Sequence, residues 1–452
     1  MIRRGTGSQS ECQYCIFWQE ERLSSLIIKG GRVIDPESGL NRKKDIEVKE
    51  GKIISIRDRI RSSGAKLFDA RGLIVAPGFI DLHAHLRDPG RPDEETIESG
   101  SKAAVHGGFT SVLCMPNTDP PIDNEGVVKY VVEQARKARM ANIFPVGAIT
   151  IGQKGVTLTE IGRMKQVGIV AVSDDGKTVK NGRILRSALE YTKIFNIPVM
   201  EHCLDEDLSD GGIINEDYYG TISGLRCSPA IAEEIIIARD LLITQFTKGR
   251  LHICHLSTEN GVKLVARAKE QKINATAETC PHYLVLTAKE CLDFNTNYKV
   301  NPPLRSDRDR KALLRGLKNG TIDAIATDHA PHATFEKELE FDKAAAGIIG
   351  LEICWPLLYS RLVKPRLLSL RQLIKLLSTN PAKIVGLKNK GRVAVGYDAD
   401  LTIIDPKITW RLTKGWLRSR SCNTPFLGER FTGRVTATIV GGAIRFQEEK
   451  KE

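Results

Sequence analysis

Two histidines, His83 and His85, stand one residue apart in residues 78–90, which read GFIDLHAHLRDPG. The apolar residues before them predict a β-strand, and side chains two positions apart on a strand point to the same side. Two neutral imidazoles on one side of a rigid strand can bind a divalent transition metal. Arg87 lies on the same side, where its guanidinium could hold an anion beside that metal. A lone His-x-His is more often a pair of ordinary strand histidines, so a metal site is predicted only if other parts of the chain supply further ligands.

Eight short β-rich runs occur between residues 79 and 328, separated by segments with the apolar spacing of amphipathic helices. The runs cover residues 79–83, 109–115, 143–148, 169–172, 198–202, 251–255, 275–279 and 324–328. Helical spacing is clear in residues 125–140 and 230–246. Alternating strands and helices favour a parallel sheet, and eight such units close into a (β/α)₈ barrel of the TIM type.

Further strand-like runs flank the predicted barrel, at residues 26–35 and 46–56 before it and 399–405 and 434–446 after it. Neither pair is long enough to bury a core alone, so we expect both ends of the chain to form one small composite β-sandwich domain. The predicted organisation is a poorly ordered leader (1–24), the first part of the β-domain (25–76), the barrel (77–387) and the second part of the β-domain (388–448).

Metal-binding residue types stand at the ends of several other predicted strands, where the active site of such a barrel gathers. The histidines at these places are His83, His85, His202, His255, His329 and His332, out of nine in the chain. The acidic candidates are Asp174 and Asp175 after the fourth run, and Asp328 after the eighth. Random placement would scatter these residues, so we expect a metal centre.

The chemistry of such a centre is hydrolytic. Four histidines and two carboxylates suffice for two metals about 3.5 to 4 Å apart, whose bridging water becomes a nucleophile near neutral pH. Asp328 could bind one metal and carry a proton between that water and a leaving nitrogen. The sequence therefore predicts metal-assisted hydrolysis of an amide-like bond, or the reverse reaction.

Composition excludes several other classes of protein. The 452 residues are 41% hydrophobic and contain no apolar run near the roughly 20 residues that span a bilayer. The N-terminus has no secretory pattern, so we expect a cytoplasmic protein without a membrane partner. The net charge of +12 is dispersed among acidic residues, which argues against nucleic-acid binding. Ten scattered cysteines imply no disulfide framework, and Cys12 and Cys15 lack the second pair of a structural zinc site.

Seven sequence blocks together resemble one known family, in its order. The blocks are GFIDLHAHLRDPG, CMPNTDP (114–120), SDDG (173–176), ETCPHYL (278–284), VNPPLR (300–305), ATDHAPH (326–332) and KGRVAVGYDADLTIID from residue 390. From about residue 26 to 446 the chain resembles the amidohydrolase superfamily and, within it, the type I bacterial dihydroorotases. Members of that family cyclise N-carbamoyl-L-aspartate to L-dihydroorotate in pyrimidine synthesis.

The resemblance assigns roles to particular residues. It implies that the metal ligands are His83, His85, Asp175, His202, His255 and Asp328, with Zn²⁺ as the metal and one or two ions per chain. It implies that Arg87 and Asn117 hold the substrate carboxylate, and that Asn301 and His332 complete the pocket. We also expect a small anionic substrate and a homodimer. A complex with aspartate transcarbamoylase, which some type I relatives form, is a further hypothesis.

Some alternatives stay open. Several relatives bridge their metals with a carbamylated lysine, but residues 169–175 contain none, which counts against a hydantoinase or allantoinase and favours Asp175 as the bridge. A non-catalytic dihydroorotase-like subunit should have lost ligands, whereas this chain keeps all six. We expect structural roles for His106 and His252, and a structural or supporting role for His282. Residues 334–351 form either a loop over the pocket or a solvated connection.

Overall fold

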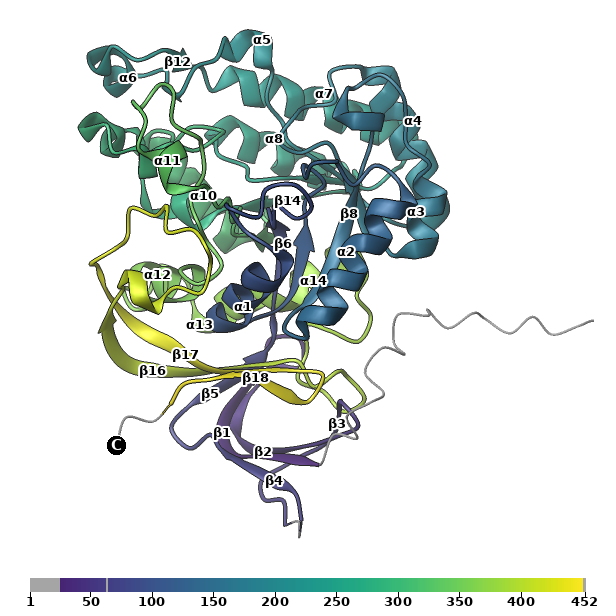
Figure 1. Cartoon of the computed structure of the whole chain (residues 1–452), viewed down its shortest axis with the longest axis vertical. Coiled ribbons are helices and arrows are strands. Elements are labelled where there is room, and N and C mark those ends of the chain that lie inside the picture. The colour runs from purple at the N-terminus through teal and green to yellow at the C-terminus, as the bar shows by residue number, and fades with distance from the viewer. Residues whose placement is uncertain (1–24, 62–63, 450–452) are drawn as a thin grey trace, which may run out of the picture.

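The computed structural model describes residues 25–61 and 64–449, so the predicted leader with Cys12 and Cys15 lies outside the described residues. A helix-coated barrel occupies one end of the molecule and a β-domain the other (Figure 1). The β-domain is coloured both purple and yellow in that view, because it is built from both ends of the described chain. Within the described residues, no helix combines the length and the apolar character needed to cross a membrane.

Eight parallel strands form the barrel in the order of the sequence. They are β6 (Phe79–Ala84), β7 (Phe109–Cys114), β8 (Asn142–Ala148), β9 (Ala171–Ser173), β10 (Val199–Glu201), β13 (Leu251–Ile253), β14 (Ala275–Thr279) and β15 (Ala324–Ile325). A parallel bridge between Ala84 and His329 closes the ring, where the His85 amide donates to the His329 carbonyl at 2.8 Å. Each strand overlaps one of the eight predicted runs, so the barrel prediction is confirmed.

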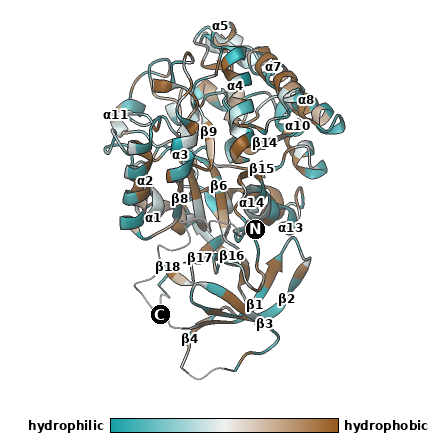
Figure 2. Cartoon of the chain, turned by 90° about the vertical axis from the view of Figure 1, so that its right-hand side faces the viewer, coloured by the Kyte–Doolittle hydropathy of each residue, from teal (hydrophilic) through white to brown (hydrophobic). Residues whose placement is uncertain are grey.

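Amphipathic helices surround this ring, and their ribbons alternate brown and teal in Figure 2. The longer ones are α1 (Ile97–Gly107), α2 (Glu125–Ala138), α4 (Gly182–Thr192), α7 (Ile231–Thr247), α8 (Glu259–Glu270) and α10 (Asp307–Asn319). Shorter ones are α3 (Ile161–Val167), α5 (Glu206–Ser209), α6 (Tyr218–Ser223), α9 (Pro281–Val285), α11 (Thr334–Lys337), α12 (Cys354–Leu358), α13 (Leu370–Ile374) and α14 (Asn380–Val385). Side-chain caps begin several of them: Asn124 accepts from two amides at the start of α2, and Ser306 begins α10 with a capping box. The helices predicted at 125–140 and 230–246 are α2 and α7.

The β-domain is one continuous sheet. Its strands are β1 (Leu26–Asp35), β2 (Leu40–Lys49), β3 (Lys52–Arg57), β4 (Lys66–Asp69), β5 (Ile74–Pro77), β16 (Leu401–Arg411), β17 (Arg430–Val440) and β18 (Ala443–Gln447). They lie in the order β18-β17-β16-β5-β1-β2-β3, with β4 paired to β1; a short pair, β11 (Ile214–Asn215) and β12 (Cys227–Ser228), lies apart from both sheets. The expected composite domain is present, and the antiparallel pairing of β16 with β5 makes one sheet of the two predicted halves. We propose to keep the predicted limits 25–76, 77–387 and 388–448.

Apolar packing joins the two domains and fills the barrel. The β-domain has its own core, to which β1, β2, β16 and β17 all contribute. A second cluster collects residues from six barrel strands and packs on α14, as expected for a filled barrel interior: Leu82, Leu113, Val146, Ala171, Met200 and Ala324. The stacked rings of Phe79 and Trp355, both fully buried, link β6 to α12. The strands that carry the polar residues are therefore held by apolar packing within the barrel and around it.

Candidate metal centre

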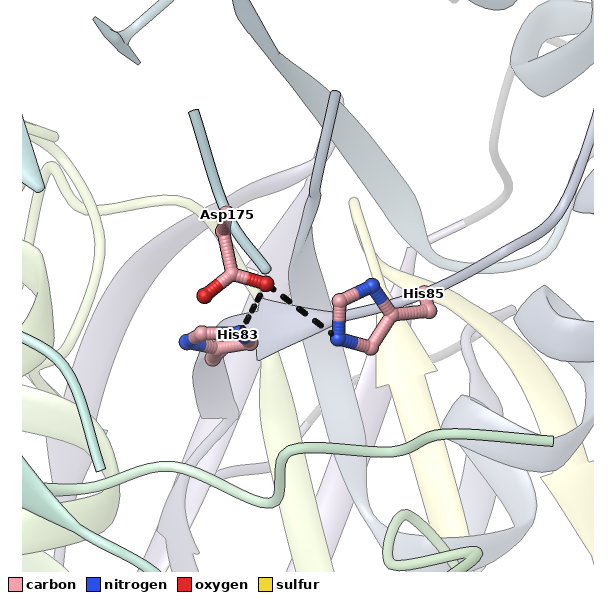
Figure 3. A group of neighbouring side chains, drawn as sticks. All are labelled: His83, His85 and Asp175. Carbon is pink, nitrogen blue, oxygen red and sulfur yellow. Dashed lines mark ion pairs between the residues drawn. The ribbon is translucent and has the colours of Figure 1, made fainter. Parts of the chain in front are cut away.

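Asp175, two residues beyond β9, lies between two pairs of histidines. Its Oδ2 atom is 3.3 Å from His83 Nε2 and 3.6 Å from His85 Nε2 (Figure 3). Its other oxygen, Oδ1, is 3.4 Å from His255 Nε2 and 3.6 Å from His202 Nδ1. Each oxygen of one carboxylate thus faces one histidine pair, which is the arrangement that a bridging ligand between two cations requires.

Asp328 completes the group three residues beyond the end of β15. Its Oδ1 atom lies 3.1 Å from His85 Nε2 and 3.7 Å from His83 Nε2. All six predicted ligands therefore meet at the C-terminal ends of five barrel strands, although they are up to 245 positions apart in the chain. The backbones of His255 and Asp328 have positive φ angles of 35° and 47°. Such strained conformations in non-glycine residues concentrate at functional sites.

Asp175 and Asp328 stay ionised because of the histidines around them. Burial raises the pKa of Asp175, but His83, His202 and His255 outweigh it and hold that pKa well below its usual range. Burial is likewise outweighed at Asp328, whose pKa is lowered by its hydrogen bond to His85 and by the charge of His83. Burial lowers the pKa of His85, which favours a neutral imidazole. Two carboxylates thus remain ionised although their residues are almost fully buried.

The side chains fit a divalent metal. His83 Nε2 is buried and has no hydrogen-bond partner. The Nδ1 atom of His83 donates to Glu278 Oε1 at 3.1 Å, and His85 Nδ1 donates to Asn117 Oδ1 at 2.8 Å. With a metal bound, the hydrogens of both rings would sit on Nδ1 and both Nε2 lone pairs would face the ion, as metal-ligating histidines require. Two possible ligand sets share Asp175, one with His83 and His85 and the other with His202 and His255.

Two further acids, Asp174 and Glu278, lie near the metal centre and form hydrogen bonds with the residues that build it. Asp174 accepts from the amides of Ile149 and Thr150 at 2.9 and 3.0 Å, directly after the end of β8. Of the two neighbouring aspartates, it is therefore Asp175 that faces the histidines. Glu278, fully buried on β14, lies 3.1 Å from both His83 Nδ1 and His252 Nε2. The sequence analysis did not single out Glu278, whose only signal is an acid in a short strand otherwise made of alanine and threonine.

The predicted substrate residues surround a cavity of about 220 Å³ that opens on the metal centre. Arg87, Asn117, Asn301 and His332 all line it, together with five of the six predicted ligands. The Arg87 Nε atom lies 2.8 Å from Glu94 Oε2, an ion pair that the sequence did not reveal. Burial lowers the pKa of Arg87 to about 10, with Glu94 opposing the shift, so the guanidinium stays charged at neutral pH.

The remaining histidines and residues 334–351 also have defined places. His106 Nδ1 lies 2.6 Å from Glu352, and His329 Nε2 lies 3.3 Å from Glu95. His282 lies outside the cavity lining, and burial lowers its pKa to about 4. Of the 334–351 segment, Ala346 and Gly347 line the cavity, so this segment forms part of the pocket wall.

A (β/α)₈ barrel with two histidine pairs around a buried aspartate at its strand ends defines a metal-dependent amidohydrolase. A family model described as "Dihydro-orotase-like" matches residues 72–261, and one described as "Amidohydrolase family" matches residues 305–446. The chain is 47% identical to a dihydroorotase of Acetivibrio thermocellus over 424 residues, covering 94% of this chain and 99% of that protein. It is 48% identical to one of Ruminiclostridium cellulolyticum over 417 residues, covering 92% and 97%. The chain therefore belongs to the dihydroorotase family and is a cyclic amidohydrolase.

Solved structures share the fold. An L-hydantoinase (dihydropyrimidinase) from Arthrobacter aurescens superposes with a TM-score of 0.84 at 27% identity, covering 94% of this chain and 97% of that one. A dihydropyrimidinase from Brevibacillus agri gives 0.80 at 24% identity, covering 94% and 95%, which shows the fold alone. Sequence identity to the dihydroorotases is thus nearly twice that to the hydantoinases.

Proposed function

We propose that this enzyme interconverts N-carbamoyl-L-aspartate and L-dihydroorotate plus water. The observation that carries the proposal is one cavity shared by the Asp175-centred ligand group and by Arg87, whose guanidinium suits a substrate carboxylate. The 45 to 48% identity to dihydroorotases over nearly the whole chain supports the same reaction.

The metal is proposed to be Zn²⁺, with one or two ions per chain, because the ligands are imidazole nitrogens and carboxylate oxygens. His83, His85 and Asp328 would hold one ion, His202 and His255 the other, and Asp175 both. When bound, such ions lower the pKa of water and polarise a carboxyl or amide carbonyl. The protein's contribution is a buried site in which Glu278 and Asn117 orient His83 and His85.

Arg87 and Asn117 are proposed to bind the substrate carboxylate that does not react. The Nε atom of Arg87 already faces Glu94 and donates to the Pro331 carbonyl at 3.2 Å. Its Nη2 atom lies 3.4 Å from His332 Nε2, so the terminal nitrogens are placed beside His332 at the cavity. The side-chain oxygen of Asn117 accepts a hydrogen bond from His85, so the N–H groups of this amide can donate to the substrate carboxylate. Asn301 and His332 close the same cavity. This set selects a ring that carries a carboxylate, which hydantoin and allantoin lack.

Asp328 is proposed to move the proton. In ring closure the ureido nitrogen forms a bond to the side-chain carboxyl carbon and one C–O bond breaks. The departing oxygen takes up the proton from the nitrogen and a second proton from solvent, and leaves as water. Asp328, ionised because its pKa is low, accepts the proton that the nitrogen loses and passes it to the departing oxygen. In hydrolysis the same carboxylate takes a proton from the attacking water and returns it to the nitrogen.

The test is an assay of the purified chain with dihydroorotate, carbamoyl aspartate, hydantoin and allantoin, combined with metal analysis. We expect turnover of the first two in both directions and a stoichiometric divalent metal. Preferred turnover of hydantoin or allantoin would replace the proposal with the hydantoinase alternative. No turnover of any of the four by metal-loaded protein would favour the non-catalytic alternative.

We further propose that the protein is a cytoplasmic homodimer and that it can associate with an aspartate transcarbamoylase. The support for these assignments is family membership alone. Gel filtration with light scattering tests the dimer, and co-elution of the mixed proteins tests the complex. A monomeric mass, or independent elution, would remove the respective assignment.

A further inference from the structure

Lys337, at the end of α11, is a buried lysine near the cavity that the proposed chemistry does not use. Its side chain is only 8% exposed, and its Nζ atom donates to the Ala345 carbonyl at 2.7 Å and to the Gly347 carbonyl at 3.3 Å. Neither acceptor is a carboxylate, so the ammonium neutralises no acid through these contacts. A lysine that gives up its hydration for two backbone carbonyls must stabilise a particular backbone path.

That backbone path forms one wall of the cavity. Ala346, between the two carbonyls, lines the cavity beside Gly347, and its own carbonyl lies 3.0 Å from His332 Nε2. Gly347 is packed so closely that an added Cβ would lie 2.7 Å from the Ala330 carbonyl oxygen and 2.9 Å from His332 Cδ2. A shift of residues 345–347 would therefore move both the wall and the His332 ring.

Lys337 also closes the loop that makes this wall. The chain leaves the cavity at His332, turns through α11, and returns to the cavity at Ala346 and Gly347, nine and ten residues after Lys337. The Lys337 side chain links the returning segment, residues 345–347, to the end of α11. Outside the loop, the Lys299 carbonyl accepts from the Gly347 amide at 2.8 Å, and Asn423 donates to the Gly347 carbonyl at 3.0 Å. The hydrogen bond from Lys337 to the Ala345 carbonyl, in contrast, joins two residues of the loop itself.

We propose that Lys337 is a positioning residue for substrate binding, which holds Ala345 and Gly347 so that the cavity wall and His332 are ready for the substrate. The proposal rests on the proposed function, because it takes this cavity as the substrate site. Lys337 does not touch the cavity directly, so it should act on substrate affinity and leave the chemical step almost unchanged.

The pKa of Lys337 adds a second testable consequence of the proposed role, a dependence of substrate affinity on pH. Burial lowers its pKa to about 7, the charge of Lys299 adds to this shift, and Glu336 opposes it. Lys299 itself donates to the Asp342 carbonyl, and Glu336 also lies 3.4 Å from His332 Nδ1. A charged donor makes stronger hydrogen bonds than a neutral one. The hold on residues 345–347 should therefore weaken as the pH rises through about 7.

The experiment compares the metal-loaded wild-type protein with Lys337→Met, which keeps most of the apolar stem but removes the charge. The matched control is Lys343→Met, a change of an exposed lysine on the same segment that pairs with Glu340. We expect Lys337→Met to raise KM for dihydroorotate about tenfold, the loss that one charge-assisted hydrogen bond implies, with kcat and metal content almost unchanged. KM of the wild type and of Lys343→Met should rise above pH 7, and this rise should be absent in Lys337→Met.

One further measurement separates a loss of positioning from a loss of folded protein. A Lys337→Ala variant should regain affinity with added ethylammonium, which a general loss of folded protein would not allow. A wild-type KM in Lys337→Met, or a loss confined to kcat, would overturn the proposal. Failure of the wild type to turn over dihydroorotate would instead overturn the proposed function, so the two failures are distinguishable.

Discussion

Glu278→Gln is the substitution that tests how the metal centre is held. One Glu278 oxygen accepts from His83 Nδ1, and the other lies 3.1 Å from His252 Nε2, with all three side chains fully buried. Because a carboxylate only accepts, His83 must carry its hydrogen on Nδ1 and present the Nε2 lone pair to the site. A glutamine can accept from only one of the two histidines. If its NH₂ group faces His83, that imidazole must move its hydrogen to Nε2 and can no longer bind a metal through it.

The size of the effect follows from these contacts. Loss of a partner that orients a metal-ligating histidine typically weakens metal binding 10- to 100-fold, or about 1.4 to 2.7 kcal/mol. The other predicted ligands near His83, namely His85, Asp175 and Asp328, keep their contacts, so binding should weaken rather than vanish. Turnover should therefore fall when zinc is limiting and recover in part when zinc is in excess.

The assay titrates dihydroorotate turnover and bound metal against free zinc in a metal buffer. Glu270→Gln, a change of an exposed acid at the end of α8, is the matched control and should behave as the wild type. Circular dichroism establishes that the Glu278→Gln protein is folded. A folded Glu278→Gln protein with the zinc affinity of the wild type would refute the reasoning that Glu278 sets the ligating nitrogen of His83.

Three further substitutions test other parts of the account. Asp328→Asn should lower kcat in both directions by roughly 10² to 10⁴, and residual activity near the wild-type level would remove its role in proton transfer. Arg87→Ala should raise KM for dihydroorotate roughly 100-fold at unchanged metal content, and an unchanged KM would argue against the carboxylate site. Asp45→Asn should destabilise the β-domain by roughly 2 kcal/mol in urea unfolding at pH 7, because Asp45 accepts from the Ile60 amide and from Lys29. Burial raises the pKa of Asp45, but these donors lower it below 3.8, so the stabilisation is complete above pH 3.8 and the difference between the two proteins should shrink as the pH falls further. A constant difference would contradict this assignment.

The barrel could be predicted from the sequence because its strands and helices have different apolar periods. The eight β-rich runs alternate with helical segments such as α2 and α7, and this alternation dictates parallel pairing. The composite β-domain from both ends of the chain was predicted as well, but no local pattern contains the strand order that joins its two halves. The β5 strand pairs with β1 on one side and with β16 on the other, and that second pairing joins residues more than 320 positions apart.

The candidate ligands could be predicted because a barrel brings strand ends together whatever the loops do. The supporting residues could not. Glu278 resembles any acid in a short strand until β14 is placed beside β13, and Glu94 lies in a loop with no periodic signal. Lys337 belongs to a charged segment that is also typical of a solvated surface. Only the folded path of residues 334–347 shows that this lysine is buried and that the segment forms the cavity wall.

The most direct test of the central claim is anomalous diffraction at the zinc edge from crystals of the zinc-loaded protein. We predict zinc beside Asp175, either at the His83 and His85 side, at the His202 and His255 side, or at both, with Asp175 as a ligand in each case. Zinc bound elsewhere, with this carboxylate free of metal in a protein that turns over dihydroorotate, would contradict it.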